Sequence, residues 1–232
     1  MSFYISISNI DSATTNIHLP TPINLINETW KVGLVEAFFP SKLPILNAKD
    51  RICMAFDGHR THTYYTANNL YFDQLSTFIT YMHEHCLAQN NINMAYIDNR
   101  VIIKNEHPKA WVAFREKVAY MLGLEKNIKI KETTTSNLDL FAGVYNIYLY
   151  LNIISPQYVG NVRTNLLKTV FIDRTSDNTH VIIEKPYYLN ISHTQLSTLT
   201  LDIRTLTGEK VIFPSGYINF TLHFKKITQN DK

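Results

Sequence analysis

Apolar and polar residues alternate along the first fifty residues, as they do in strands that bury one face. Three segments show this pattern: 3–8, 14–19 and 28–39. Four prolines punctuate the same stretch and exclude helix interiors there: Pro20, Pro22, Pro40 and Pro44. The pattern therefore predicts three strands, of which the third is long and rich in aromatic residues.

The same alternation returns after residue 142. It predicts five more strands, over 145–153, 166–173, 180–184, 196–204 and 217–226. Alternation in the last strand turns four apolar side chains inward: Ile218, Phe220, Leu222 and Phe224. His223 belongs to the outward set of that strand.

Two short hairpins are expected in the stretch between these zones. The first joins 51–56 to 61–65 around Asp57-Gly58, and the second joins 94–97 to 101–104 around Asp98-Asn99. Both turns carry residues that tolerate the backbone angles of a tight hairpin.

Helical spacing appears twice in the same stretch. A first helix is expected after a cap at Asn68 or Asn69, with apolar positions Leu75, Phe78, Ile79, Met82 and Cys86. A second helix is expected from Trp111, Phe114, Val118 and Leu122, after Pro108, and Gly123 ends it.

This order of elements predicts a mainly β fold. The strands outside the middle stretch number about eight, as in a single antiparallel jelly-roll β-sandwich. The predicted domains are the jelly-roll sandwich, 1–50 with 142–232, and an inserted α+β subdomain, 51–141, with two hairpins and two helices. Such an insertion is physically reasonable because the cost of closing a loop rises only slowly with its length.

The composition is that of an ordinary globular protein, with 45% hydrophobic residues, 18% charged residues and a formal net charge of +3. Lys and Arg form no block, which argues against a dedicated nucleic-acid protein. Cys53 and Cys86 are the only cysteines, and we expect them to be reduced and buried. No apolar run approaches the roughly 20 residues of a membrane span, and residues 1–16 lack a secretory leader pattern. We therefore expect a protein made in the cytoplasm, or destined for the nucleus, without a membrane partner.

The sequence offers little for catalysis. His83 and His85 flank Glu84 in a predicted helix, where residues two apart point roughly 200° away from each other and cannot share a metal. His59 and His62 are spaced to lie on opposite faces of a strand. With seven glycines in the chain and no nucleophile in an elbow sequence, we expect no catalytic residue, no cofactor site and no metal site.

Glu36 is the most informative charged residue. It shares strand parity with Trp30, Val32, Leu34 and Phe38, so alternation aims its carboxylate at the apolar side. A charge there is costly unless it is paired or lies at the rim of the sandwich. It is either a subunit-contact or rim ion pair, or a structural pair within one subunit. The candidate partners within a subunit are Arg163, Arg204 and His223.

Tyr148 and Tyr150 form an outward aromatic stripe on the strand 145–153. Tyrosine supplies large contact area at low entropy cost, so such a stripe suits a partner surface, or else the inserted subdomain packs over it. The candidate subunit or insert contacts are Glu36, Tyr148, Tyr150 and His223. The expected structural anchors are Trp30, Gly33, Pro40, Gly123, Phe220 and Leu222.

Spaced segments along most of the chain resemble the penton, or minor capsid, protein of Polinton/Maverick-type elements, adintoviruses and virophages. The resemblance lies in WKVGLVEAFFP at 30–40, the helix and hairpin of the middle stretch, VAYMLGL at 118–124, and several segments of the last third. Those last segments are 158–170, Pro186-Tyr187-Tyr188, 198–213 and 215–226. Their order and spacing together carry the resemblance.

The resemblance implies a non-enzymatic structural protein of the virion. Such a protein forms homopentamers at the vertices of an icosahedral double-stranded DNA virus or virus-like transposon, next to the major capsid protein. It would be assembled inside the host cell, in cytoplasm or nucleus, with packaged DNA as a non-specific partner at most. Two alternatives stay open: a jelly-roll binding module for a sugar or receptor, and a nucleic-acid-binding protein that uses the inserted subdomain.

Overall fold

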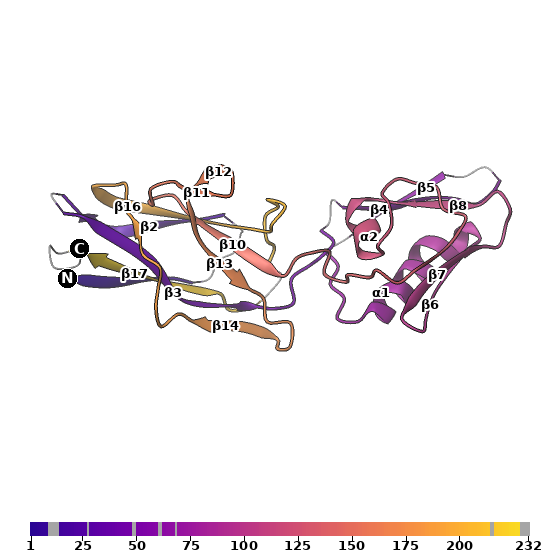
Figure 1. Ribbon diagram of the computed structural model, residues 1–232, viewed down its shortest axis with the longest axis horizontal. Coiled ribbons are helices and arrows are strands. Elements are labelled where there is room, and N and C mark those ends of the chain that lie inside the picture. The colour runs from indigo at the N-terminus through magenta and orange to yellow at the C-terminus, as the bar shows by residue number, and fades with distance from the viewer. Residues whose placement is uncertain are drawn as a thin grey trace. The chain divides into compact units, whose positions relative to one another are not determined.

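The computed structural model describes residues 1–8, 14–26, 28–47, 50–59, 62–67, 69–213 and 216–227. The chain divides into two compact units, both visible in Figure 1. The first unit, here called the sandwich, combines Met1–Leu43 with Val144–Lys232. The second unit, here called the insert, is Pro44–Gly143.

The first boundary lies earlier than the sequence pattern placed it. Leu43 packs in the core of the sandwich. Ile45 and Leu46 instead donate backbone hydrogen bonds to Leu70 of the insert. The units therefore meet at 43/44 and 143/144, whereas alternation had suggested 50/51 and 141/142.

Eight principal strands build the sandwich within the described residues. They are β1 (Ser2–Ser8), β2 (Thr14–Asn24), β3 (Trp30–Pro40), β10 (Asn146–Leu151), β13 (Leu166–Phe171), β14 (Asn178–Ile182), β16 (Gln195–Arg204) and β17 (Asn219–Lys226). The first sheet has the order β1-β17-β3-β14, and the second has the order β13-β10-β16-β2. The pairings are antiparallel. Two four-stranded sheets exchanging strands in this way make a jelly roll, which confirms the predicted fold class.

Three short strands complete this unit. β15 (Leu189–Asn190) pairs with β3 beyond the end of β14. β11 (Gln157–Val159) and β12 (Val162–Thr164) form a separate hairpin in the connection from β10 to β13.

The core of the sandwich lies between the inward faces of the two sheets. Ile147, Leu149 and Leu151 of β10 are fully buried, while the residues between them are half-buried. Phe220 and Leu222 of β17 are also fully buried, which confirms the inward direction assigned from alternation. Burial of apolar area of this kind is the main favourable term in the folding of the unit.

A β-bulge in β3 changes which of its residues face the core. Leu222 lies opposite Leu34, but the next pair is Thr221 with Glu36, so Val35 is an extra residue relative to β17. Trp30, Val32 and Leu34 are buried before the bulge, and Ala37 and Phe39 are buried after it. The prediction that Glu36 points to the apolar side is therefore wrong, because one extra residue reverses the alternation.

The insert contains two three-stranded antiparallel sheets. One has the order β5-β4-β8 and the other has the order β6-β7-β9. Their strands are β4 (Arg51–Phe56), β5 (His62–Thr66), β6 (Ile92–Ile97), β7 (Arg100–Asn105), β8 (Trp111–Phe114) and β9 (Glu132–Thr135). The two hairpins are at the predicted places, and Asp98 and Asn99 take the positive φ angles of 49° and 59° that a tight turn needs.

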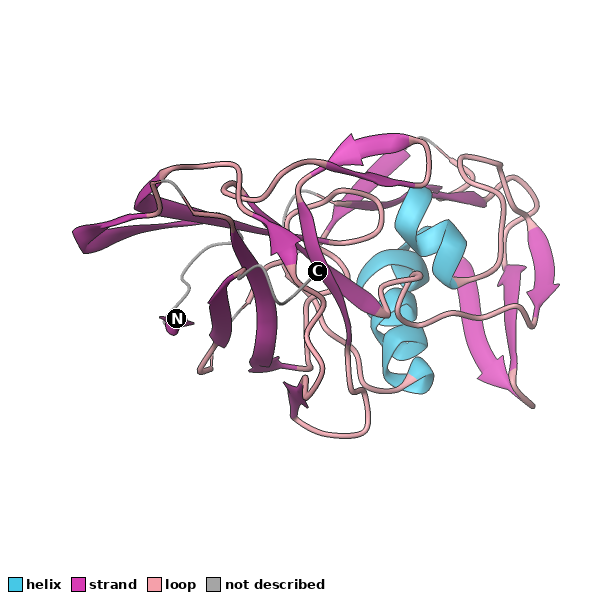
Figure 2. Cartoon of the chain, turned by 60° about the vertical axis from the view of Figure 1, so that its left-hand side comes forward, coloured by secondary structure: helices cyan, strands magenta, loops and turns pink. Residues whose placement is uncertain are grey.

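The helical segments of the described chain all belong to the insert, as the cyan ribbons of Figure 2 show. α1 (Leu75–Met82) continues as a π-helical turn, η1 (His83–Leu87), and a 3-10 turn, η2 (Ala88–Asn90). α2 (Glu116–Met121) is short. The expected cap at Asn69 is wrong, because Gln74 is the N-cap of α1, and Asn68 lies outside the described residues.

The second predicted helix is half strand. Trp111–Phe114 forms β8, which pairs with β4, and all four of its residues are buried. A strand buried on both faces is continuously apolar, so its spacing also fits a helix. Helix α2 begins only after Arg115, whose backbone is extended. Gly123 follows the end of this helix with a φ of +62°, as expected of a C-terminal glycine.

We expect truncation of the inward residues of β17 to destabilise the sandwich strongly. Phe220→Ala and Leu222→Ala each remove a fully buried side chain, which costs about 2–5 kcal/mol in the free energy of unfolding. Thr221→Ser is the matched control, because Thr221 points outward and serine keeps the hydroxyl that bonds Ser6, Glu36 and Asn219, so the loss should stay below about 1 kcal/mol. Urea denaturation measures all three, and equal losses would contradict the assigned faces.

Gly123 and Gly160 have nearly the same φ angle but different surroundings, so replacing each by alanine distinguishes the cost of backbone strain from the cost of a steric clash. Gly123 and Gly160 have φ of +62° and +61°, so alanine at either position costs about 1–2 kcal/mol from its Cβ. A Cβ on Gly123 would lie 2.2 Å from the carbonyl oxygen of Asn137, whereas Gly160 has open space around it. We expect Gly123→Ala to destabilise its unit more than Gly160→Ala does, as measured by hydrogen exchange in each unit. An equal effect would show that Asn137 moves away freely.

Candidate functional site

The outer face of the second sheet carries the predicted tyrosine stripe. Tyr148 and Tyr150 project from β10 on the side opposite to the core, and both are half-buried. Their cross-strand neighbours on β16 are Arg204 and Asp202, respectively. The sheet thus holds two tyrosine rings beside the carboxylate of Asp202 and the guanidinium of Arg204.

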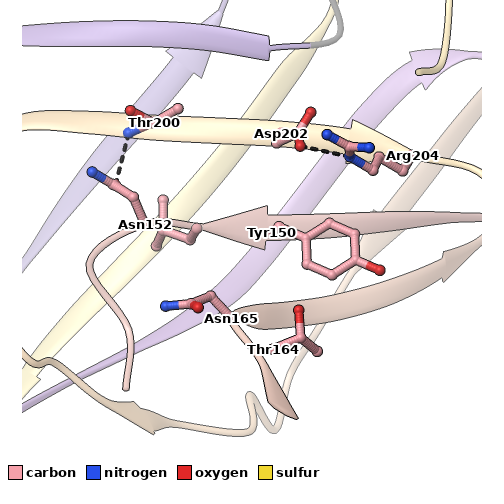
Figure 3. Close-up of a pocket in the computed structure, with 8 residues that line it drawn as sticks. Tyr150, Asn152, Thr164, Asn165, Thr200, Asp202 and Arg204 are labelled. Atoms are coloured by element: carbon pink, nitrogen blue, oxygen red, sulfur yellow. Dashed lines mark hydrogen bonds and ion pairs between the residues drawn. The ribbon is translucent and has the colours of Figure 1, made fainter. Parts of the chain in front are cut away.

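An open hollow of about 550 Å³ lies beside Tyr150. Its lining comes from β10, β16 and the segment that ends β12, and Figure 3 shows the side chains around it. The lining residues are Tyr150, Leu151, Asn152, Thr164, Asn165, Thr200, Asp202 and Arg204. The hollow combines one aromatic ring with amide, hydroxyl and charged groups.

The polar groups of this hollow are largely held by one another. The amide oxygen of Asn152 accepts a 2.8 Å hydrogen bond from the backbone nitrogen of Thr200. Arg204 Nε donates to Asp202 at 2.7 Å, and Thr14 donates to the other carboxylate oxygen of Asp202 at 2.8 Å. The charges of Asp202 and Arg204 therefore offset each other, which gives a nearly neutral amphipathic surface suited to contact.

The β11–β12 hairpin next to this hollow exposes apolar side chains. Tyr158 is 79% exposed and Val162 is 58% exposed. Gln157 anchors the hairpin by donating to the carbonyl oxygen of Leu166 at 2.7 Å. Apolar alternation does not predict this hairpin, although Gly160-Asn161 between two valines is a two-residue turn signal that indicates it.

Glu36 lies on the outer face of the first sheet. Its carboxylate is 3.0 Å from Nε2 of His180 on β14 and accepts a 3.1 Å hydrogen bond from Thr221 on β17. The ring of His180 also packs edge-on against Phe38, with 5.6 Å between ring centroids. Neighbouring strands of the same sheet thus supply the partners of Glu36.

None of the three partners suggested for Glu36 is the one that the structure shows. Arg204 pairs with Asp202 in the other sheet, and Arg163 lies on β12. His223 is on the same sheet as Glu36, but its ring contacts Tyr188 and Tyr4. The bulge at Val35 is the physical reason, because it moves Glu36 from the inward face to the outward face.

His223 is covered by a segment of its own chain. Its Nδ1 lies 2.6 Å from the hydroxyl of Tyr188, and its ring stacks on Tyr4 at 4.4 Å between centroids. Its Nε2 is buried without a hydrogen-bond partner among the described residues. Burial, and then the nearby charge of Lys225, lower the pKa of His223 because both disfavour the imidazolium form.

Gly33 explains how this cover can approach the sheet. A Cβ at Gly33 would lie 3.1 Å from Cβ of Pro186, 3.1 Å from the carbonyl oxygen of Tyr187 and 3.3 Å from the ring of Tyr188. The segment 186–188 therefore crosses the outer face of β3 at a place where a side chain hardly fits.

The other expected anchors hold the ends of β3. Trp30 is buried at one end, where its indole nitrogen donates to Glu28 at 3.0 Å and its ring lies 5.5 Å from Phe3. Pro40 is the last residue of β3, opposite Asn178 of β14.

His83 and His85 of the insert have different neighbours. His83 Nδ1 accepts a hydrogen bond from the backbone nitrogen of Met94, whereas His85 stacks on Tyr81 at 4.4 Å. His59 lies against His107, with 4.6 Å between their rings. In the parts of the chain that the structure describes, no group of three or more His, Cys, Asp or Glu side chains could hold a metal ion.

The helices of the described residues are all too short or too polar to span a bilayer.

No family model and no curated protein matches the sequence. Solved structures do match in fold. The mavirus penton protein superposes with a TM-score of 0.52 at 10% identity, covering 98% of this chain and 100% of that one. A chain of the Sputnik virophage structure superposes with a TM-score of 0.51 at 12% identity, covering 97% of this chain and 98% of that one. The chain is therefore similar in fold, over nearly its whole length, to the mavirus penton protein and to a chain of the Sputnik virophage structure.

The lowered pKa of His223 predicts a pH-dependent contribution to stability. Because the folded state binds this proton less readily than the unfolded chain, the contribution is complete above the unfolded pKa of about 6.5 and is lost as pH falls below it. We expect His223→Gln to flatten the dependence of the urea midpoint on pH between about 8 and 5. The difference in urea midpoint between wild type and variant at pH 8 measures the packing lost with the ring. Parallel plots of midpoint against pH would contradict the lowered pKa of His223.

Proposed function

We propose that this protein is a structural component of a virion, the pentameric vertex capsomer of an icosahedral double-stranded DNA virus or virus-like transposon. The observation that carries the proposal is the agreement in fold with the mavirus penton protein over 98% of this chain and all of that one. The agreement extends over the sandwich and the insert together, not over a jelly roll alone. The segments 30–40 and 215–226, which resemble penton proteins in sequence, contain all of β3 and all of β17, which are paired in the first sheet.

A non-enzymatic role agrees with what the polar side chains do. Asp202 is held by Arg204 and Thr14, and Glu36 is held by His180 and Thr221. Groups committed to each other in this way keep a surface rigid and nearly neutral. Such a surface favours contact with another protein over proton transfer to a substrate.

Two outer faces of different chemistry suit a closed ring. One face has Tyr148 and Tyr150 beside Asp202 and Arg204, and the other has Glu36 with His180. A ring of five needs heterologous contacts, in which each copy presents one surface to its neighbour on one side and a different surface to the other. An interface of standard size buries about 800 Å² per partner, and aromatic residues are enriched in such interfaces.

The same role defines the location and the other partners. The protein belongs in the virion, is assembled in the cytoplasm or nucleus of the host cell, and contacts the major capsid protein around the vertex. Any contact with packaged DNA is non-specific, because a net charge of +3 spread over the chain provides little phosphate neutralisation.

One observation favours a second candidate function, recognition of a sugar. The hollow beside Tyr150 joins an aromatic ring to amide and hydroxyl groups from Asn152, Asn165 and Thr200. Rings pack against the apolar face of a sugar while such polar groups bond its hydroxyls. Binding to a glycan array that Tyr150→Ala abolishes, from a protein that stays monomeric, would favour this function over the capsomer.

We expect the purified protein to form pentamers. Size-exclusion chromatography with light scattering should give a mass five times 26.9 kDa, about 135 kDa, and negative-stain images should show rings of five. Truncating large aromatic residues at an interface centre costs about 2 kcal/mol or more, so Tyr148→Ala with Tyr150→Ala should shift the protein toward a monomer.

Tyr64→Ala is the matched control for the tyrosine pair. Tyr64 lies in the insert and is 60% exposed, so its loss removes the same ring from a different surface. We expect this variant to remain pentameric. A wild-type protein that stays monomeric at a concentration of about 100 µM would contradict the proposed capsomer, whereas a pentamer that survives the double variant would contradict only the placement of the interface.

A further inference from the structure

The only two cysteines of the chain lie together in the core of the insert. Cys53 is on β4, the central strand of its sheet, and Cys86 is in the π-helical turn η1. Each has a residue exposure of 1%, and both are free thiols. The proposed capsomer function uses neither of them.

Hydrogen bonds fix the two segments against each other. Cys53 lies directly opposite Tyr65 in the β4–β5 ladder. The side-chain nitrogen of Asn90, just after η1, donates to the hydroxyl of Tyr65 at 2.8 Å and to the carbonyl oxygen of Cys86 at 2.9 Å. Gln89 donates a second hydrogen bond to the hydroxyl of Tyr65, at 2.7 Å. This network holds the β4–β5 hairpin beside the turn that carries Cys86, and the two thiols lie close enough to interact with each other.

The π-helical turn determines which residues of this segment are buried. Continuing the α-helical spacing of Phe78 and Met82 would bury His85 together with Cys86. The wider turn instead leaves His85 exposed and buries Cys86 with Leu87. Single π turns of this kind recur at functional sites.

The environment also makes the two sulfurs unequal. The hydrogen bond to Cys86, together with burial, raises the pKa of Cys53. The same hydrogen bond, in which Cys53 donates, lowers the pKa of Cys86 because it stabilises the thiolate of that residue. Cys86 therefore ionises first and is the better nucleophile, while Cys53 keeps its proton.

We propose that Cys53 and Cys86 are an oxidation site, at which a peroxide converts the thiol pair into an intramolecular disulfide. The thiolate of Cys86 attacks one peroxide oxygen, the O–O bond breaks, and Cys86 becomes a sulfenic acid with release of hydroxide. The sulfur of Cys53 then attacks the sulfur of Cys86, the S–O bond breaks, and the proton of Cys53 leaves with the hydroxyl as water. The two thiols are oxidised by two electrons and one peroxide is reduced to two waters.

The disulfide would join the central strand of one sheet to the helical segment beside it. It would close a loop of 33 residues by numbering, which constrains the unfolded chain and stabilises the insert. A protein made in a reducing cell and later exposed to an oxidising medium would gain this link only after release. The chemistry needs only the insert and does not rest on the proposed capsid role.

The test uses the full-length reduced protein treated under native conditions with hydrogen peroxide. After quenching and unfolding with an alkylating agent present, we expect the two alkylatable thiols per chain to fall to none. Peptide mapping should find Cys53 linked to Cys86 by a bond that dithiothreitol cleaves. Thermal unfolding of the insert should shift upward by on the order of 10 °C, and the reductant should reverse the shift.

Cys53→Ser and Cys86→Ser are the matched controls, since each leaves one thiol and should show no upward thermal shift with peroxide. The wild-type result stands by itself if either variant fails to fold. Two thiols that remain alkylatable after native treatment would overturn the proposal. A link that forms only in unfolded protein, or only between chains, would overturn it as well.

Discussion

The structure depends on the pairing of β3 with β17. These strands come from the first and last parts of the chain, yet they lie side by side in the first sheet and supply much of the sandwich core. β3 also pairs with β14 and β15, so three segments that follow the insert in sequence bond to one strand that precedes it. The sandwich cannot close until these distant contacts form, which is typical of a fold with high contact order.

This arrangement explains why a large insert is tolerated between β3 and β10. The insert has its own sheets, its own helices and its own buried residues, so it does not draw on the core of the sandwich. Its folding depends on local hairpins such as β6–β7, whose turn at Asp98-Asn99 adopts the required backbone angles by itself. A self-sufficient insert adds little closure cost for the strands on either side.

The alternation of apolar residues predicted most of the sandwich, because most of its principal strands alternate more buried residues with more exposed ones. It failed at Glu36, since the bulge at Val35 has no composition signal and reverses every later residue of β3. It failed at Trp111–Phe114, because a strand buried on both faces has no alternation to detect. The partners of Glu36 and the cover over His223 come from tertiary contacts between distant segments, which no local pattern contains.

The crossing of residues 186–188 over Gly33 limits where another molecule can bind the outer face of the first sheet. By placing Pro186, the carbonyl oxygen of Tyr187 and the ring of Tyr188 against Gly33, the chain buries part of the outer face of its own sheet. Any molecule that docks on this sheet meets a raised ridge there, so its footprint must pass to one side of it. The glycine at position 33 thereby lets residues 186–188 divide the outer face of the first sheet into two separate binding surfaces.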